Sequence, residues 1–264
     1  SFIIATRFNP FQADKLMKIS FLTKPNFNKE SCLVIGVFED GKLAPSYPSL
    51  DKEFVNHALS TMTFKGKKLE TLRLMAPLEA PYGQLLLVGL GNAEKINAQV
   101  LQEVGAAVIA ATQKTRLKKI VFDLNTAEIC NAAKICAHLA AGAQLRSWKF
   151  DLYKTKPKET STLEELVLVT PDAEASEQTF KTLEAVNEGV SLTRHVVSEP
   201  PNILYPETMA AKALELEKLG FKVEVLNQEE MKKLGMGALL GVAQGSIKEP
   251  KLVILQWLKG SKDV

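Results

Sequence analysis

Residues 84–124 read QLLLVGLGNAEKINAQVLQEVGAAVIAATQKTRLKKIVFDL, and this stretch decides the fold class. Residues 84–89 and 119–124 are short, nearly continuous apolar runs, as expected for strands that are covered on both faces. The residues between them, 94–113, predict an amphipathic helix because one apolar face recurs every fourth position, at Ile96, Val100, Val104 and Val108. The order strand, helix, strand predicts a layered α/β domain with a mainly parallel or mixed sheet.

The same alternation extends outward in both directions from this stretch. Further strands are predicted at 18–23, 32–38, 69–76, 163–170, 222–226 and 251–257. Further helices are predicted to about Met62 after a cap at Ser49 or Asp51, and at 127–145, 171–198, 206–219 and 228–234, with a glycine-rich stretch at 235–245. Pro171 is expected at the first position of the helix at 171–198. Gly220 is the expected C-terminal stop of the helix that begins at Pro206.

Breaks in composition divide the chain. Residues 154–162 are polar, charged and contain proline, so they predict a linker after an N-terminal α/β domain at 17–162. The strand and helix at 163–198 then connect to a second unit at 199–264, which has too few elements for a complete doubly wound domain. Residues 1–16 precede an internal start at Met17 and are interpreted as an extension or an expression remnant.

The composition argues against a dedicated nucleic-acid binder, a disulfide-rich protein and a membrane protein. The chain has 264 residues, is 46% hydrophobic and carries a net charge of only +3, unlike dedicated nucleic-acid binders with dense basic stripes. Cys32, Cys130 and Cys136 lack C-x-x-C spacing, which predicts free thiols in a reducing compartment. No apolar run has the length of a membrane span, and the N-terminal apolar stretch is too short for a signal peptide, so a cytoplasmic location is expected.

One turn has the spacing of a phosphate-binding loop. Gly89 and Gly91 follow a predicted strand and precede a predicted helix. The dinucleotide fingerprint needs a third glycine where this chain has Glu94, whose charge would oppose a pyrophosphate. A tight strand-to-helix turn is therefore the favoured interpretation.

Histidine pairs are the next candidates. Glu53 and His57 lie four residues apart on a predicted helix, but one pair supplies only two metal ligands, which favours a solvated surface pair. His195 and Glu199 have the same spacing next to Pro200, which interrupts the helix. His138 lies in an alanine-rich helix and is predicted to be packed or capping.

Nucleophile motifs and basic clusters are also incomplete. Ser49 and Lys52 match S-x-x-K, but the accompanying K-T-G and S-D-N motifs are absent, and Ser49 suits a helix cap. Gly245-Ser246 lacks the flanking pattern of a nucleophile elbow. The basic cluster at 114–119 follows a helix, where cations stabilise the C-terminal end, although a weak nucleic-acid contact stays open as an alternative.

Four segments resemble the leucyl (cytosol) aminopeptidase family. Residues 236–246, Met-Gly-Ala-Leu-Leu-Gly-Val-Ala-Gln-Gly-Ser, are similar to the family's G-M-G-[AG]-[LF]-L-[AG]-V-[AG]-x-G-[ST] segment. Residues 200–207 resemble its N-x-P-x-N-x-x-x-P-x segment, with Asn202 and Pro206 matching and Glu199 and Pro200 departing from the common spelling. Residues 86–91 and 148–154, with Gly142, resemble the family's L-x-x-V-G-L-G and G-x-x-L-x-x-Y-x-F-x-x-Y-K segments.

The resemblance implies a fold and a reaction. The expected architecture is an N-terminal three-layer, macro-domain-like α/β sheet, then a linker helix and the incomplete start of a second α/β catalytic domain. The family hydrolyses N-terminal residues, often leucine, from peptides with two bridged divalent metal ions, usually zinc or manganese. Its members form homo-oligomers, typically hexamers, and no membrane partner is expected.

The family's metal and catalytic residues lie in V-G-K-G-x-T-F-D-[ST]-G-G and N-T-D-A-E-G-R segments, and neither segment occurs in this sequence. No catalytic, cofactor-binding or metal-binding residue is therefore predicted in the chain, which is expected to be inactive alone and to bind no metal. The alternative is a non-catalytic DNA-binding or scaffold module derived from the family, for which the cluster at 114–119 is the local support.

Overall fold

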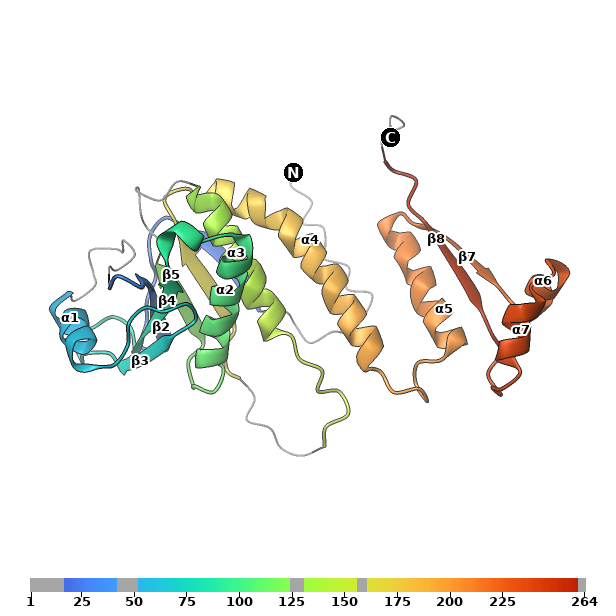
Figure 1. The fold of residues 1–264 in the computed structure, drawn as a ribbon, viewed down its shortest axis with the longest axis horizontal. Coiled ribbons are helices and arrows are strands. Elements are labelled where there is room, and N and C mark those ends of the chain that lie inside the picture. Colours follow the sequence, from blue (N-terminus) through green and yellow to red (C-terminus); the bar gives the residue numbers. More distant parts are fainter. Residues whose placement is uncertain (1–16, 42–51, 124–130, 156–160, 261–264) are drawn as a thin grey trace. The chain divides into compact units, whose positions relative to one another are not determined.

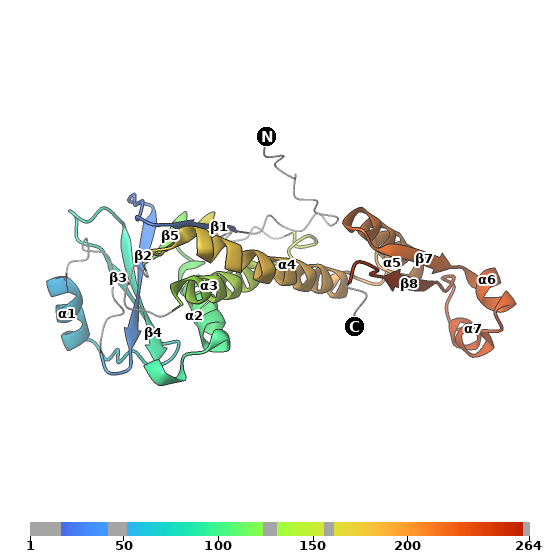
Figure 2. The same cartoon turned by 90° about the horizontal axis from the view of Figure 1, so that it is seen from above.

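The computed structural model describes residues 17–41, 52–123, 131–155 and 161–260. The chain separates into two compact units, one from Asp14 to Ser191 and one that includes the residues from Leu192 onward. Figure 1 shows the elements in chain order, and Figure 2 shows them from above. Within the described ranges, no helix is long and apolar enough to cross a lipid bilayer.

The first unit is built on a six-stranded sheet with the order β1-β6-β5-β2-β4-β3. The strands are β1 Lys18–Leu22, β2 Ser31–Phe38, β3 Thr71–Met75, β4 Gln84–Gly91, β5 Lys119–Asp123 and β6 Glu165–Val169. All neighbours pair in parallel except β3, which runs antiparallel to β4 at one edge. The prediction of an α/β fold with a mainly parallel or mixed sheet is confirmed.

Helices cover both faces of this sheet, which gives three layers (Figure 1). One face packs against α2 Ala98–Thr112, α3 Ala132–Ser147 and the first half of α4 Ala173–Ser198. The other face packs against α1 Lys52–Thr61 and the loop residues Phe64 and Tyr82. Alternate residues of β2 enter the two cores, because Val34 faces α2 and α3 while Leu33 faces the α1 side.

The helix boundaries depend on local capping. The predicted helix at 94–113 is in fact a short 3-10 turn, η1 Ala93–Lys95, followed by α2. Asn97 has an extended backbone and its side chain accepts a hydrogen bond from the amide of Val100, so the helix starts only at Ala98. Ile96 therefore does not lie on the apolar face of α2, whereas Val104 and Val108 are buried there as predicted.

Two other helix boundaries also differ from the sequence prediction. Asp172 accepts a hydrogen bond from the amide of Ala175 and caps α4, so Pro171 precedes the helix instead of occupying its first position. α3 begins at Ala132 after Asn131, and residues 127–130 of its predicted first turns lie outside the described residues.

The second unit contains α5 Pro206–Leu214, η2 Glu215–Leu219, β7 Lys222–Leu226, α6 Gln228–Lys233, α7 Gly237–Ala243 and β8 Leu252–Gln256. β7 and β8 form an antiparallel pair that α5 contacts. Gly220 ends η2 with a φ of 99°, which confirms it as the helix stop.

Candidate functional site

The turn with phosphate-loop spacing is a site of close backbone packing. A β-carbon on Gly89 would collide with the carbonyl group of Lys67, and Gly91 has a φ of +75° beside the side chain of Lys68. The Gly89 amide donates to Glu70 O at 2.7 Å, and the Gly91 amide donates to Gly66 O at 3.0 Å. Both amides are therefore engaged by the protein itself, so the two glycines form no phosphate cradle. They lie within the end of β4 and not in a turn as predicted, and the connection to η1 begins only at Asn92.

The predicted surface pair on α1 is confirmed as solvent-facing, because both Glu53 and His57 are exposed. His138 is half-buried on α3, and its Nδ1 lies 3.3 Å from the side-chain Nε2 of Gln102 on α2. Burial, followed by the charge of Lys134, lowers the pKa of His138 below its ordinary value. His138 is thus a packed histidine between two helices, as predicted.

His195 and Glu199 come together at the end of α4. The imidazole Nε2 lies 3.1 Å from Glu199 Oε1, and their side chains are only 10% and 4% exposed. The amide of Glu199 also donates to the carbonyl of His195, which holds the last turn in place before Pro200. Two such groups supply too few ligands for a metal site. Their contact instead joins the last turn of α4 to the proline-rich turn that follows it.

The described cysteines are buried thiols. Cys32 on β2 and Cys136 on α3 are fully buried and unpaired with each other. Burial raises the pKa of Cys32 to about 12 and that of Cys136 to about 11, so both stay protonated and unreactive at neutral pH. Cys130 lies outside the described residues.

The basic cluster at 114–119 is partly neutralised within the fold. Lys118 pairs with Glu30 at 2.9 Å, and Lys119 lies 3.7 Å from Glu165, which also binds Lys18. These contacts fasten β1, β5 and β6 at the edge of the sheet where the strands begin. Lys118 and Lys119 therefore have a role in the fold, and these contacts add no support for the nucleic-acid alternative.

The two serine candidates lead to no nucleophile. Ser49 lies outside the described residues, so its interpretation as a helix cap stays a prediction. Ser246 is exposed, and its hydroxyl accepts a hydrogen bond from the amide of Lys248 in a turn after α7. No histidine lies within that hydrogen-bond pattern to act as a base.

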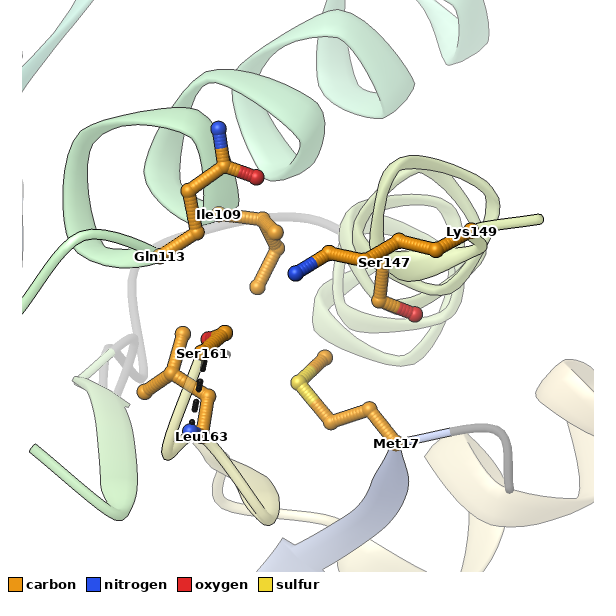
Figure 3. Close-up of a pocket in the computed structure, with 7 residues that line it drawn as sticks. All are labelled: Met17, Ile109, Gln113, Ser147, Lys149, Ser161 and Leu163. Carbon is orange, nitrogen blue, oxygen red and sulfur yellow. Dashed lines mark hydrogen bonds between the residues drawn. The ribbon is translucent and has the colours of Figure 1, made fainter. Parts of the chain in front are cut away.

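A cavity of about 150 Å³ lies in the first unit at the edge of the sheet where β1 and β6 begin (Figure 3). Its walls come from the residue before β1, the ends of α2 and α3, and the segment before β6: Met17, Ile109, Gln113, Ser147, Lys149, Ser161 and Leu163. Lys149 extends its ammonium group into this space, while Met17, Ile109 and Leu163 supply apolar walls (Figure 3).

This cavity lies opposite the usual binding edge of an open α/β sheet, which is at the carboxyl ends of the strands. The sequence pattern did not single it out, because its residues come from four separate segments and share no motif. Lys149 appears in the sequence only as part of the segment 148–154 that resembles the aminopeptidase family.

The described residues do not provide the donor set of a metal pair. They contain no group of three or more histidine, cysteine, aspartate or glutamate side chains positioned to hold a metal ion. A two-metal site needs several carboxylates around both ions, so no step of a metal-assisted reaction is assigned to these residues. That the chain has no site residue of this kind stays a prediction.

Two family models match the chain in sequence order. Residues 34–157 match the N-terminal domain of the cytosol aminopeptidase family, and residues 191–264 match the catalytic domain of the same family. The two matches fall on the six-stranded sheet unit and on the unit that follows it.

Proteins with similar sequences are named probable cytosol aminopeptidases. The chain is 42% identical over 205 residues to a probable cytosol aminopeptidase of Rhizobium rhizogenes, a match that covers 75% of this chain and 41% of the relative. It is 35% identical over 249 residues to one from Rhizobium etli, covering 93% of this chain and 50% of the relative. The chain thus spans about half the length of the curated relatives it matches.

Solved structures share the fold. A tomato leucine aminopeptidase variant superposes with a TM-score of 0.78 at 24% identity, covering 92% of this chain and 51% of that one. The bottromycin maturation enzyme BotP in complex with Mn superposes with a TM-score of 0.66 at 21% identity, covering 87% and 45%. The fold therefore corresponds to about half of each of these chains. With both family models matched in order, the chain belongs to the cytosol aminopeptidase family, a family of peptidases.

Proposed function

We propose that this chain is part of a metal-dependent leucyl aminopeptidase that removes N-terminal residues, often leucine, from peptides. The observation that carries the proposal is the ordered pair of family matches, in which the catalytic-domain model begins at residue 191. Relatives named probable cytosol aminopeptidase support it, since the alignment extends over 93% of this chain. The family name supports a cytoplasmic location.

In this proposal the chain contributes three parts. Residues 17–162 form the N-terminal α/β domain, residues 163–198 form a strand and a connecting helix, and residues 199–264 begin the catalytic domain. The connecting part is joined closely to the first, because β6 pairs with both β1 and β5 in one sheet. Residues 1–16 are proposed to be an extension or an expression remnant.

The second unit supports the idea that it is the beginning of a larger domain. β7 and β8 form a sheet of only two strands, and an isolated pair of strands is marginally stable in water. Large apolar side chains of this unit are exposed, among them Leu234, Val242, Ile247, Trp257 and Leu258. Such surface is typical of a face that packs against more protein.

The metal pair, manganese or zinc, would be held by residues outside the described part of this chain. When bound, it would polarise the scissile carbonyl and activate a water molecule. By itself the chain is proposed to bind no metal and to be inactive. The complete protein is proposed to act on peptides as a homo-oligomer, a hexamer.

A fusion tests this proposal. The 264-residue chain would be joined, at the aligned position, to the remaining C-terminal half of the Rhizobium etli relative, to which it is 35% identical. With added Mn²⁺, the fusion is expected to release the chromophore from leucine p-nitroanilide, and the 264-residue chain alone is not. EDTA-treated fusion is the matched control and is expected to be inactive.

Each outcome bears on a separate part of the proposal. Release of leucine by the 264-residue chain alone would overturn its proposed inactivity. A fusion that folds and binds manganese but does not cleave the anilide would count against the aminopeptidase assignment. Mass photometry of the fusion tests the oligomer, because a hexamer has six times the mass of one chain.

A further inference from the structure

The cavity beside Lys149 combines one cation with apolar walls. Lys149 is half-buried, and its ammonium group points into the cavity (Figure 3). Among the described residues it has no hydrogen-bond or ion-pair partner. An anionic ligand in the cavity would gain a charge-assisted hydrogen bond from this ammonium group.

A second polar group faces the same space. The hydroxyl oxygen of Ser161 accepts a hydrogen bond from the amide of Leu163 at 3.4 Å, which leaves its hydrogen available to donate (Figure 3). Ser147, by contrast, uses its hydroxyl hydrogen on the carbonyl of Gln144 at 2.8 Å. Lys149 and Ser161 thus each offer a donor to an acceptor group in the cavity, and the one from Lys149 is charged.

The electrostatics of the surroundings limit an anionic ligand to a single negative charge. The cavity lies at the C-terminal ends of α2 and α3, next to Gln113 and Ser147, and helix C-termini carry partial negative charge. A dianion such as phosphate would be repelled by both helix ends and would meet only one ammonium group. A carboxylate matches one lysine with its one charge.

The remaining walls select for an apolar tail. Ile109 is 2% exposed, Met17 is 8% exposed, and Leu163 is half-buried, so these three side chains supply an aliphatic lining beside the polar groups. Its volume of about 150 Å³ equals that of engineered apolar cavities that admit benzene. A short branched aliphatic chain fits such a space.

We propose that this cavity binds a small monocarboxylate with a short apolar tail, whose carboxylate pairs with Lys149 and whose tail packs against Met17, Ile109 and Leu163. Two sources share this chemistry: a free aliphatic amino acid and a simple aliphatic acid. The proposal is independent of the proposed peptidase function, since it needs neither the metal ions nor the missing half of the relatives.

The test uses the ¹⁵N-labelled 264-residue chain and three probes with one carbon skeleton: 4-methylpentanoate, its uncharged amide 4-methylpentanamide, and L-leucine. Binding is followed by the backbone amide resonances of Lys149, Ser161 and Leu163. The carboxylate is expected to shift them saturably with a millimolar Kd, and the amide is expected to bind at least about tenfold more weakly, equal to about 1.4 kcal/mol. Leucine binding at least as tightly as 4-methylpentanoate identifies an amino acid as the ligand, and weaker binding identifies a simple acid.

A matched pair of variants locates the site. Lys149→Met is expected to weaken carboxylate binding at least about tenfold, while Lys95→Met, which removes an exposed lysine elsewhere, leaves it unchanged. If Lys149→Met does not fold, the proposal is tested by comparing the Kd values of 4-methylpentanoate and 4-methylpentanamide for the unaltered chain. Absence of saturable shifts with both carboxylates, or equal binding of the acid and its amide, overturns the proposal.

Discussion

Gly142 on α3 lies directly against the backbone carbonyl of Gln102 on α2, so closely that a β-carbon at position 142 would overlap the carbonyl oxygen. The reverse contact occurs one turn away, where Gly105 on α2 meets the carbonyl of Leu139 on α3. Two glycines, one from each helix, therefore allow the two backbones to approach, and this helix pair covers one face of the sheet.

Gly142→Ala is expected to lower the free energy of unfolding by about 1–3 kcal/mol or more, because backbone cannot move aside as a flexible side chain can. Urea unfolding followed by circular dichroism measures it. Gly189→Ala in α4 is the matched control, since nothing lies within 4 Å of its added β-carbon, and it should be neutral or stabilising by up to about 1 kcal/mol. Equal effects of the two substitutions would contradict the close approach of α2 and α3.

Asn187 joins α4 to α3 through two buried hydrogen bonds. Its amide nitrogen donates to Ala141 O at 3.0 Å and to Gln144 Oε1 at 2.8 Å. Asn187→Ala should destabilise the first unit by about 1–3 kcal/mol, because the buried Gln144 side chain loses its partner. Thermal unfolding of this variant is compared with that of Thr182→Ala, an exposed position on the same helix, and no difference between them would show that the bonds do not stabilise the fold.

The buried thiol of Cys136 should make the free energy of unfolding fall in alkaline solution. Burial raises the pKa of its thiol from 9.0 in the unfolded chain to about 11, while hydrogen bonds with Thr170 and Ser176 act in the opposite direction. Between pH 9 and pH 11 the thiol releases its proton only in the unfolded state, which stabilises that state. The stability that the buried thiol contributes is therefore complete below pH 9 and is lost as the pH rises toward 11. The free energy of unfolding falls by about 1.4 kcal/mol for each pH unit in this range.

Urea unfolding of the unaltered chain and of Cys136→Ala, measured across this pH range, isolates the effect. The difference in unfolding free energy between the two chains should shrink as the pH rises. Parallel pH profiles would mean that the thiol is not shielded from water.

Metal ions provide a prediction for the 264-residue chain itself. Since the described residues contain no cluster of ligands, Mn²⁺ and EDTA should leave its Tm equal within error. The fusion with the C-terminal half of the Rhizobium etli relative should show a higher Tm with Mn²⁺ than with EDTA. A manganese-dependent increase in the short chain would reveal a site that the described residues do not explain.

Most helices and strands could be predicted because apolar patterns and turn residues within a short stretch of sequence determine them. The apolar runs that became β2 and β4 are buried on both faces, and Gly220 has the positive φ expected of a helix stop. The start of α2 was placed too early because the apolar period continues back to Ile96, whereas the capping side chain of Asn97 determines the actual boundary.

Features that depend on distant pairing could not be predicted. The order of the strands and the antiparallel direction of β3 arise from contacts between separate parts of the chain. α7 forms within the glycine-rich stretch although Gly237 and Gly241 disfavour helix, so its sequence gave no signal for it. The cavity beside Lys149 was missed for the same reason, since no single segment contains its chemistry.

The pairing of β1 with β6 has a consequence for synthesis of the protein. Lys18 pairs with Glu165, so the first strand must wait for the last strand of the sheet before it can be paired. At about 5–20 residues per second, a ribosome needs about 7–30 seconds to make the intervening chain. During that interval Ile19 and Phe21 have no sheet to join, which makes the nascent first strand a natural target for chaperones.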